Sequence, residues 1–346
     1  MYEALRARLA DMVPDFELRH KAEVAAEVNR LKAERNAVVL GHNYMEAALF
    51  HSVCDYKGDS LELSRLAAEA PGDPIVFCGV RFMAETAKIL SPEKTVLLPT
   101  ARGGCSLAES ITGADVRRLR QKYPGVPVVT YVNTYADVKA ETDVCCTSSN
   151  AVQVVESLES DQVIFLPDEF LALNVARETG KSITFPTLDP EMPQNGGDPN
   201  IHYDLVGWHG RCEVHEQFTT EDVVAVRRQF PDVMVLAHPE CSPDVVEASD
   251  FVGSTSALIR SVKEADASRY LLLTECSMAD NIVAENPDKE MVRLCSVRCP
   301  HMNQITLENV QNALLHNHYE VDVPEPARTR ARASIERMLE ISFGPR

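Results

Sequence analysis

Three cysteines, each inside a short polar loop, are the residues of this sequence best suited to hold a metal. They are Cys105, Cys212 and Cys299. Thiolate sulfur binds iron–sulfur clusters and other soft metals, and three sulfurs leave one coordination position open. The chain has ten cysteines. In a reducing cytosol such a number favours metal binding or catalysis over disulfides.

These cysteines close three copies of a weak internal repeat. Each copy opens with a β-branched run that ends in polar residues, at 38–44, 128–133 and 233–240. Hydroxyl residues that begin a helix come next, and then a second apolar run, at 75–84, 163–172 and 271–280. The second copy is longer than the other two because of an insertion near 185–205, which is rich in Pro, Gly, Asn and Asp. Equal positions in three copies predict that the three sulfurs meet around a pseudo-threefold axis.

The elements that must position these sulfurs alternate between strand and helix. This order predicts an α/β fold in which helices cover short parallel sheets. We expect three similar α/β domains around the axis, with the active site at the centre. The expected divisions are an N-terminal helical segment 1–35, repeats 36–122, 123–228 and 229–323, and a C-terminal helix 324–346.

Polar residues at the strand ends are further candidates for the site, because ligands of α/β sheets bind beyond the carboxyl ends of the strands. These residues are His42, Tyr44, Tyr131, Asn133, His238 and Glu240. Ser60, Ser148 and Thr255 fall where each copy enters its helix. Helix N-termini favour anions, although hydroxyl residues are also ordinary N-caps there.

The charge and hydropathy of the chain exclude several classes of function. A formal net charge of −18 disfavours binding to nucleic acid or to an anionic membrane. No apolar run approaches the roughly 20 residues that cross a bilayer, and the N-terminus lacks the apolar core of a secretory signal. We therefore expect a cytoplasmic protein.

The motifs together resemble the quinolinate synthases, from Val38 to about Leu315. The matching segments are GHNYM (41–45), GDSLELS (58–64), CGVRFMAETAKIL (78–90), GGCSLAES (103–110), YVNTYADVKAETD (131–143), CTSSNA (146–151), FLPD (165–168), WHGRCEVHE (208–216), HPECSPDVV (238–246), FVGSTS (251–256), TEC (274–276) and CPHM (299–302). Their order and spacing carry the resemblance.

The resemblance implies an enzyme that condenses iminoaspartate (iminosuccinate) with dihydroxyacetone phosphate to give quinolinate for NAD synthesis. It implies a [4Fe–4S] cluster on Cys105, Cys212 and Cys299, with one iron left open as a Lewis acid. It also leaves room for a transient contact with the enzyme that produces iminoaspartate. Glu240 is the expected general base, assisted by Tyr44 and His42. The substrate contacts are expected at His42, Ser60, Tyr131, Val132, Asn133, Ser148, His238, Pro239, Glu240 and Thr255.

Two other functions compete with this one. A hydro-lyase of the aconitase type also uses three cysteines and an open iron. A redox or zinc regulator would use Cys295 and Cys299 as a sensing pair, but the sequence has no basic stripe of the kind that binds nucleic acid. Glycine-rich nucleotide motifs and the H-E-x-x-H motif are also absent from the sequence.

Overall fold

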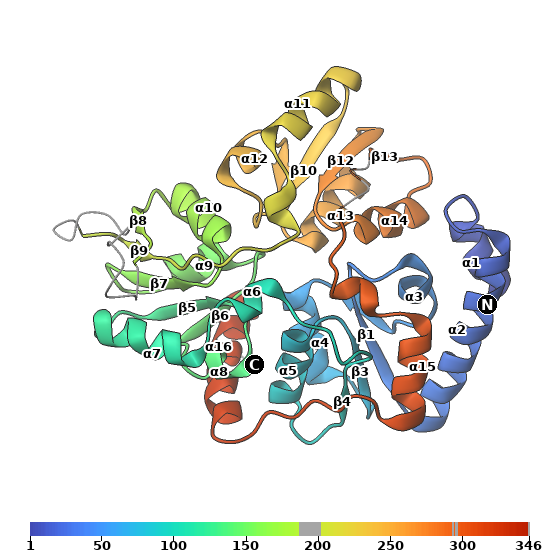
Figure 1. Ribbon diagram of the computed structural model, residues 1–346, viewed down its shortest axis with the longest axis horizontal. Coiled ribbons are helices and arrows are strands. Elements are labelled where there is room, and N and C mark those ends of the chain that lie inside the picture. The colour runs from blue at the N-terminus through green and yellow to red at the C-terminus, as the bar shows by residue number, and fades with distance from the viewer. Residues whose placement is uncertain (187–201, 293, 295–296, 345–346) are drawn as a thin grey trace.

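The strands form parallel sheets that lie around a common centre. The computed structural model describes residues 1–186, 202–292, 294 and 297–344. Within these ranges three parallel sheets are present, one for each sequence repeat, as Figure 1 shows. The predicted α/β class and its threefold arrangement are therefore confirmed. The domain divisions stay predictions, and most of the insertion near 185–205 lies outside the described residues.

The strand order is the same in all three sheets. In the first sheet it is β2 (Tyr56–Gly58), β1 (Val38–His42), β3 (Ile75–Cys78) and β4 (Val96–Leu97). In the third sheet it is β11 (Phe251–Val252), β10 (Met234–Ala237), β12 (Arg269–Leu273) and β13 (Glu290–Val292). The second sheet has β6 (Val144–Cys146), β5 (Val128–Tyr131), β7 (Val163–Leu166), β9 (Leu205–Val206) and an added edge strand β8 (Ile183–Thr184).

The apolar runs form strands because both faces of each sheet are covered. Every residue of β1, β3, β5 and β7 is buried. Parallel strands that are buried on both faces read as continuous apolar runs rather than as an alternating pattern. Strands β1, β5 and β10 each lie inside their sheet, between two neighbouring strands, and residues that follow their carboxyl ends line one cavity.

The helices also recur in the same order. The first repeat has α3 (Ala47–Ser52), α4 (Ser60–Glu69), α5 (Arg81–Leu90), α6 (Ser106–Glu109) and α7 (Gly113–Lys122). The second has α8 (Ala136–Lys139), α9 (Ala151–Glu156), α10 (Glu169–Thr179), η1 (His215–Gln217) and α11 (Thr220–Gln229). The third has α12 (Pro243–Glu247), α13 (Thr255–Glu264), α14 (Cys276–Glu285), η2 (Met302–Gln304) and α15 (Leu307–His316).

One aspartate in each repeat sets the register of the first strand. The backbone N–H of each aspartate donates to the carbonyl oxygen of a valine, and a carboxylate oxygen of the same aspartate accepts the N–H of that valine. The aspartates are Asp55, Asp143 and Asp250. The partner valines are Val39, Val128 and Val235. This alignment makes His42, Tyr131 and His238 equivalent, and it makes Tyr44, Asn133 and Glu240 equivalent two residues later. The strand-end candidates therefore occupy matching places in the three repeats.

The cysteine loops are held by another repeated hydrogen bond. The first residue of α5, α10 or α14 donates its N–H to the carbonyl oxygen that lies two residues before the cysteine. These N···O distances are 2.7 Å to Gly103, 2.8 Å to Gly210 and 3.1 Å to Val297. Seven residues after each cysteine, a threonine begins the next helix with a capping box: Thr112, Thr219 and Thr306. Both ends of each cysteine loop are thus fixed by the same local structure.

The repeats are tied to one another in a cycle. Glu85 on α5 accepts the N–H of Ala136 in the second repeat, at 2.8 Å. Asn174 on α10 donates to carbonyl oxygens of the third repeat, and Asn281 on α14 donates to carbonyl oxygens of the first. All three side chains are buried. Each repeat therefore holds the loop that follows the first strand of its neighbour.

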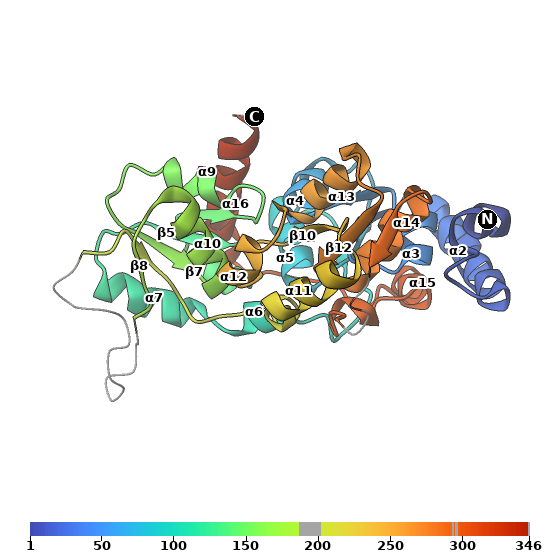
Figure 2. The ribbon, with the colours of Figure 1, turned by 90° about the horizontal axis from the view of Figure 1, so that it is seen from above.

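The terminal helices pack on the outside of this ring. Helix α1 (Tyr2–Leu9) and helix α2 (Asp15–Arg35) lie at one end of the molecule, and α2 packs against α15. Helix α16 (Ala327–Phe343) packs against α8 and β6 of the second repeat (Figure 2). None of the helices in the described ranges combines the length and the apolar character needed to span a bilayer.

One local expectation was wrong. Ser148 was expected to open a helix, but α9 begins only at Ala151. Residues 147–150 form a turn instead, because Asn150 Oδ1 accepts the backbone N–H of Thr147 at 2.6 Å. Ser60 and Thr255 are the first residues of α4 and α13, and the N-caps are Asp59 and Ser254. The hydroxyl of Ser148 still lines the central cavity described below.

Candidate functional site

The carboxyl ends of β1, β5 and β10 open into a central cavity. Its empty volume is ≈ 670 Å³, including space open to solvent. Most of the predicted site residues line it: His42, Tyr44, Ser60, Cys105, Tyr131, Asn133, Ser148, Cys212, His238, Glu240, Thr255 and Cys299. Val132 and Pro239 are not among the lining residues, because each lies between two residues that face the cavity.

The three cysteines present their thiols to this cavity in matching surroundings. Burial raises the pKa of Cys105 to about 12 and that of Cys299 to about 11, and it raises the pKa of Cys212 well above its usual value. For each cysteine, hydrogen bonds from the backbone N–H groups two and three residues later in the chain lower the pKa. Cys105 is also close enough to Cys212 and Cys299 for their charges to interact.

This donor set fits a metal–sulfur group. Three half-buried thiols at equivalent positions, each with two backbone N–H groups near the sulfur, supply soft ligands and hydrogen bonds to stabilise their charge. A bound metal would favour the thiolate forms that burial disfavours. Cys295, the predicted sensing partner of Cys299, lies outside the described residues.

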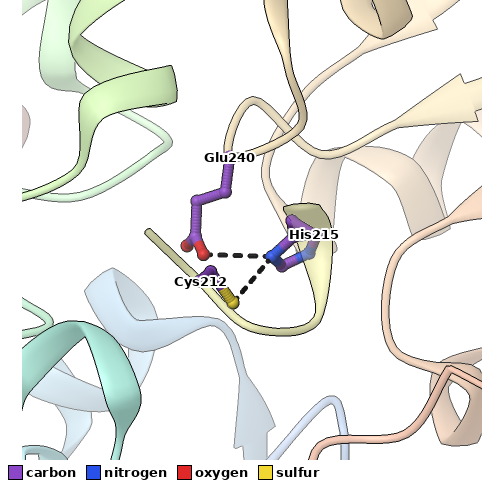
Figure 3. A group of neighbouring side chains, drawn as sticks. All are labelled: Cys212, His215 and Glu240. Atoms are coloured by element: carbon purple, nitrogen blue, oxygen red, sulfur yellow. Dashed lines mark hydrogen bonds and ion pairs between the residues drawn. The ribbon is translucent and has the colours of Figure 1, made fainter. Parts of the chain in front are cut away.

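Glu240 lies at the centre of a hydrogen-bond network beside Cys212. Tyr131 donates its hydroxyl proton to Glu240 Oε1. His215 Nδ1 lies 3.0 Å from Glu240 Oε2 and 3.2 Å from Cys212 Sγ, and Figure 3 shows these two contacts. Burial raises the pKa of Glu240, but the charge and hydrogen bond of His215 lower it by more, so the net pKa is well below the usual value. Glu240 is therefore an ionised, fully buried carboxylate that faces the cavity.

His215 and Thr274 are important neighbours that the sequence-based prediction missed. His215 Nε2 lies 3.0 Å from Thr274 Oγ1, and the Tyr44 hydroxyl lies 2.6 Å from the same oxygen. The His215 ring also stacks on His238, with centroids 4.6 Å apart. The Cys-x-x-His spacing from Cys212 to His215 was an available signal, because residues at such spacings often share a metal site.

Cys212, His215 and Glu240 could also hold a metal ion as a group. One ligand atom from each lies within 4.8 Å of the others. A sulfur, an imidazole nitrogen and a carboxylate oxygen suit zinc or iron. The cavity therefore offers a second donor set that shares Cys212 with the three-cysteine set.

His42, His238, Tyr44 and Tyr131 are neutral at ordinary pH. Burial lowers the pKa of His42 to about 4 and that of His238 to about 3. Burial raises the pKa of Tyr44 and Tyr131 well above the usual value, and nearby Glu240 adds to this effect. Each neutral imidazole offers one donor and one acceptor, and each phenol offers a hydroxyl proton.

The hydroxyl end of the cavity is held together by Asp59. Its Oδ2 accepts hydrogen bonds from Ser149 at 3.1 Å and Ser254 at 3.0 Å, and its Oδ1 accepts the N–H of Glu62 at 3.0 Å. One carboxylate from the first repeat thereby joins the second and third repeats. Among the described residues, the cavity lining includes four histidines but no lysine or arginine. An anionic ligand would therefore depend on N–H and O–H donors there.

The arrangement can bind a small anion, hold a metal–sulfur group and move protons at one place. The ionised carboxylate of Glu240 can accept a proton, and neutral His42 and protonated Tyr44 can pass one on. Ser60, Ser148 and Thr255 line the same cavity. These features suit an enzyme that acts on small anionic molecules.

Comparisons with known proteins point to one family. The family model described as "Quinolinate synthetase A protein" matches residues 26–340. The quinolinate synthase of Sinorhizobium fredii is 51% identical over 337 residues, which cover 97% of this chain and 88% of that protein. That of Caulobacter vibrioides is 49% identical over 333 residues, or 95% and 84% of the two chains. That of Xylella fastidiosa is 51% identical over 311 residues, or 90% and 85%.

Proposed function

The chain belongs to the quinolinate synthetase A family of NAD-biosynthesis enzymes, and from that premise we propose that it condenses iminoaspartate with dihydroxyacetone phosphate. The products are quinolinate, one phosphate and two waters. The nitrogen and four carbons of the ring product come from iminoaspartate, and the other three carbons come from the triose. The proposed setting is the cytoplasm.

The observation that supports this proposal most strongly is the equivalence of the three cysteine loops at one cavity. Cys105, Cys212 and Cys299 occupy the same place in each repeat and line the same cavity as the strand-end side chains. We propose that they hold a [4Fe–4S] cluster with one iron free of protein ligands. When bound, this cluster supplies a Lewis acid that polarises a substrate oxygen.

The protein residues provide the proton transfers. Glu240 is ionised and can remove a proton from a substrate carbon or hydroxyl as general base. Its contacts with Tyr131 and His215 fix the carboxylate before a substrate arrives. Tyr44 remains protonated beside Thr274 and can donate to a leaving oxygen, while neutral His42 can pass a proton on.

The other predicted residues position the two substrates. Ser60 and Thr255 are at the N-termini of α4 and α13, where free N–H groups favour phosphate or carboxylate. Ser148 comes from the turn before α9 and lines the same cavity. We propose that these hydroxyls bind the anionic groups, and that Tyr131, Asn133 and His238 bind the reacting portion.

An anaerobic assay tests the proposal. Protein reconstituted with iron and sulfide should form quinolinate and release phosphate only when both substrates are supplied. A hydro-lyase would instead add water to, or remove water from, a single substrate without releasing phosphate. Phosphate release from dihydroxyacetone phosphate without iminoaspartate, or no quinolinate from cluster-loaded protein, would contradict the condensation.

A further inference from the structure

The loops that follow β1, β5 and β10 share a feature that concerns how the cavity residues are held. In each loop, two backbone carbonyl groups flank the residue that faces the cavity, and one buried side chain donates to both. The flanking pairs are Asn43 and Met45 around Tyr44, Val132 and Thr134 around Asn133, and Pro239 and Cys241 around Glu240.

Two of the three donors are neutral amides from the neighbouring repeat. Asn281 Nδ2 lies 3.1 Å and 2.8 Å from its two carbonyl oxygens in the first repeat. Asn174 Nδ2 lies 2.9 Å from each of its two in the third. The matching position on α5 is Thr86, whose hydroxyl donates to Phe82 of its own helix at 2.8 Å. A neighbouring amide is therefore missing at the second repeat.

At the second repeat, Lys139 provides the two hydrogen bonds that an asparagine amide provides at the other two repeats. Its Nζ lies 2.8 Å from the carbonyl oxygen of Val132 and donates also to Thr134. Lys139 comes from the end of α8 in the same repeat, and its side chain is completely buried. We call each such pair of hydrogen bonds, from one side chain to the two flanking carbonyl groups, a clamp. The clamp around Asn133 thus differs from the other two because its donor is an ammonium group.

The ammonium group lies directly behind the wall of the cavity. Its Nζ is 5.4 Å from the centre of the Phe82 ring, and Phe82 lines the cavity. Burial lowers the pKa of Lys139, while the nearby Cys145 and Glu85 raise it. Two carbonyl oxygens and an aromatic face are surroundings that stabilise a cation.

The described lining of the cavity has no lysine or arginine of its own, although the proposed substrates are anions. The Oδ1 atom of Asn133 is buried and has no hydrogen-bond partner among the described residues, so no contact of this oxygen fixes the amide. The amide can therefore present its Nδ2 donor, rather than the Oδ1 acceptor, to an anionic oxygen. Because Lys139 is completely buried, solvent screens its charge only weakly. Its positive charge would therefore raise the electrostatic potential at the amide of Asn133.

We propose that Lys139 is a positioning residue that fixes Asn133 and supplies the positive potential for an anionic oxygen, carboxylate or phosphate, bound at Asn133. This proposal rests on the proposed function for the identity of the anions. The two neutral clamps hold Tyr44 and Glu240, which are assigned to proton transfer, whereas the charged clamp holds the amide assigned to binding. The ammonium group is therefore placed beside the residue that is assigned to binding.

The experiment uses three variants that separate charge from hydrogen bonding. Lys139→Met removes both, Lys139→Gln keeps a donor without charge, and Lys139→Arg keeps both. The control is Lys32→Met, because Lys32 is also buried and donates to the carbonyl oxygen of Val53. Unlike Lys139, which contacts the lining residue Phe82, Lys32 forms its hydrogen bonds with residues that do not line the cavity. Calorimetric titration with inorganic phosphate and, separately, with succinate measures anion affinity in cluster-loaded protein.

We expect Lys139→Met and Lys139→Gln to weaken the binding of one of these anions by about tenfold or more, since the attraction between two opposite charges separated by one layer of buried protein has roughly that effect. Lys139→Arg and Lys32→Met should bind both anions like the wild type. The anion that is affected identifies the group bound at Asn133.

Wild-type affinity in Lys139→Gln would overturn the role of the charge, and wild-type affinity in both neutral variants would overturn the whole proposal. Failure of the wild type to bind either anion would overturn it as well. If Lys139→Met does not fold, the comparison of the Gln and Arg variants still shows whether the charge at this position affects anion affinity. Anion binding does not require turnover, so wild-type protein that binds anions but makes no quinolinate contradicts only the proposed function.

Discussion

Asp59 gives the sharpest test of how the three repeats are joined, through the variant Asp59→Ala. The change removes the N-cap of α4 and the shared acceptor of Ser149 and Ser254. A lost N-cap costs about 1 kcal/mol. The buried bond from Ser254 to a charged acceptor is worth about 2 kcal/mol, and the part-buried bond from Ser149 is worth about 0.5–1 kcal/mol. We therefore expect the free energy of unfolding to fall by about 4 kcal/mol.

Thr219→Ala is the matched control, because Thr219 caps α11 and its side chain bonds only within that capping box. It should cost about 1 kcal/mol. Thermal unfolding followed by circular dichroism on metal-free, reduced protein compares the two variants. For a chain of this size about 2 °C per kcal/mol is expected, so Asp59→Ala should lower the Tm by about 8 °C and the control by about 2 °C. Equal shifts would show that Asp59 is an ordinary cap and that our account of the repeat junction is incorrect.

Three further outcomes are expected. Glu240→Gln should reduce turnover by about a hundredfold or more while the absorption spectrum of the cluster is retained; near-normal turnover would remove Glu240 as the base. Cys105→Ala should abolish bound iron and sulfide after anaerobic reconstitution, whereas Cys78→Ala, which alters a buried strand residue, should retain them; iron and sulfide analysis of both variants decides. Thr274→Val removes the hydroxyl that Tyr44 and His215 share, so turnover should fall about tenfold with the iron content unchanged, and an unaffected rate would mean that this contact is only structural.

The repeat made much of the architecture predictable from the sequence. The strand-end residues and cysteine loops lie at equal offsets in three copies, and equal offsets fold into equal places once the register of each first strand is set. The resemblance to quinolinate synthases and the repeat pointed to the same three cysteines. The family and the α/β fold were confirmed, whereas the roles of the individual site residues remain proposals.

Other features could not be read from a linear pattern. The clamps from Asn174 and Asn281 join residues far apart in the chain, and nothing near either residue marks its partner. The late start of α9 arises because Asn150 and Thr147 bond locally, and such side-chain bonds compete with helix formation. Lys139 looked like any lysine in a helix of mixed charge, and only burial distinguishes it.

The cyclic ties between repeats have a consequence for how the protein gains and loses structure. A linear solenoid has two end repeats that need caps, and it can unravel from either end one unit at a time. Here α5, α10 and α14 each hold a loop of the next repeat, and the third returns to the first. Opening any one junction leaves buried polar groups of two repeats without partners at once. We therefore expect the ring to melt as a single unit, with no stable fragment of one or two repeats.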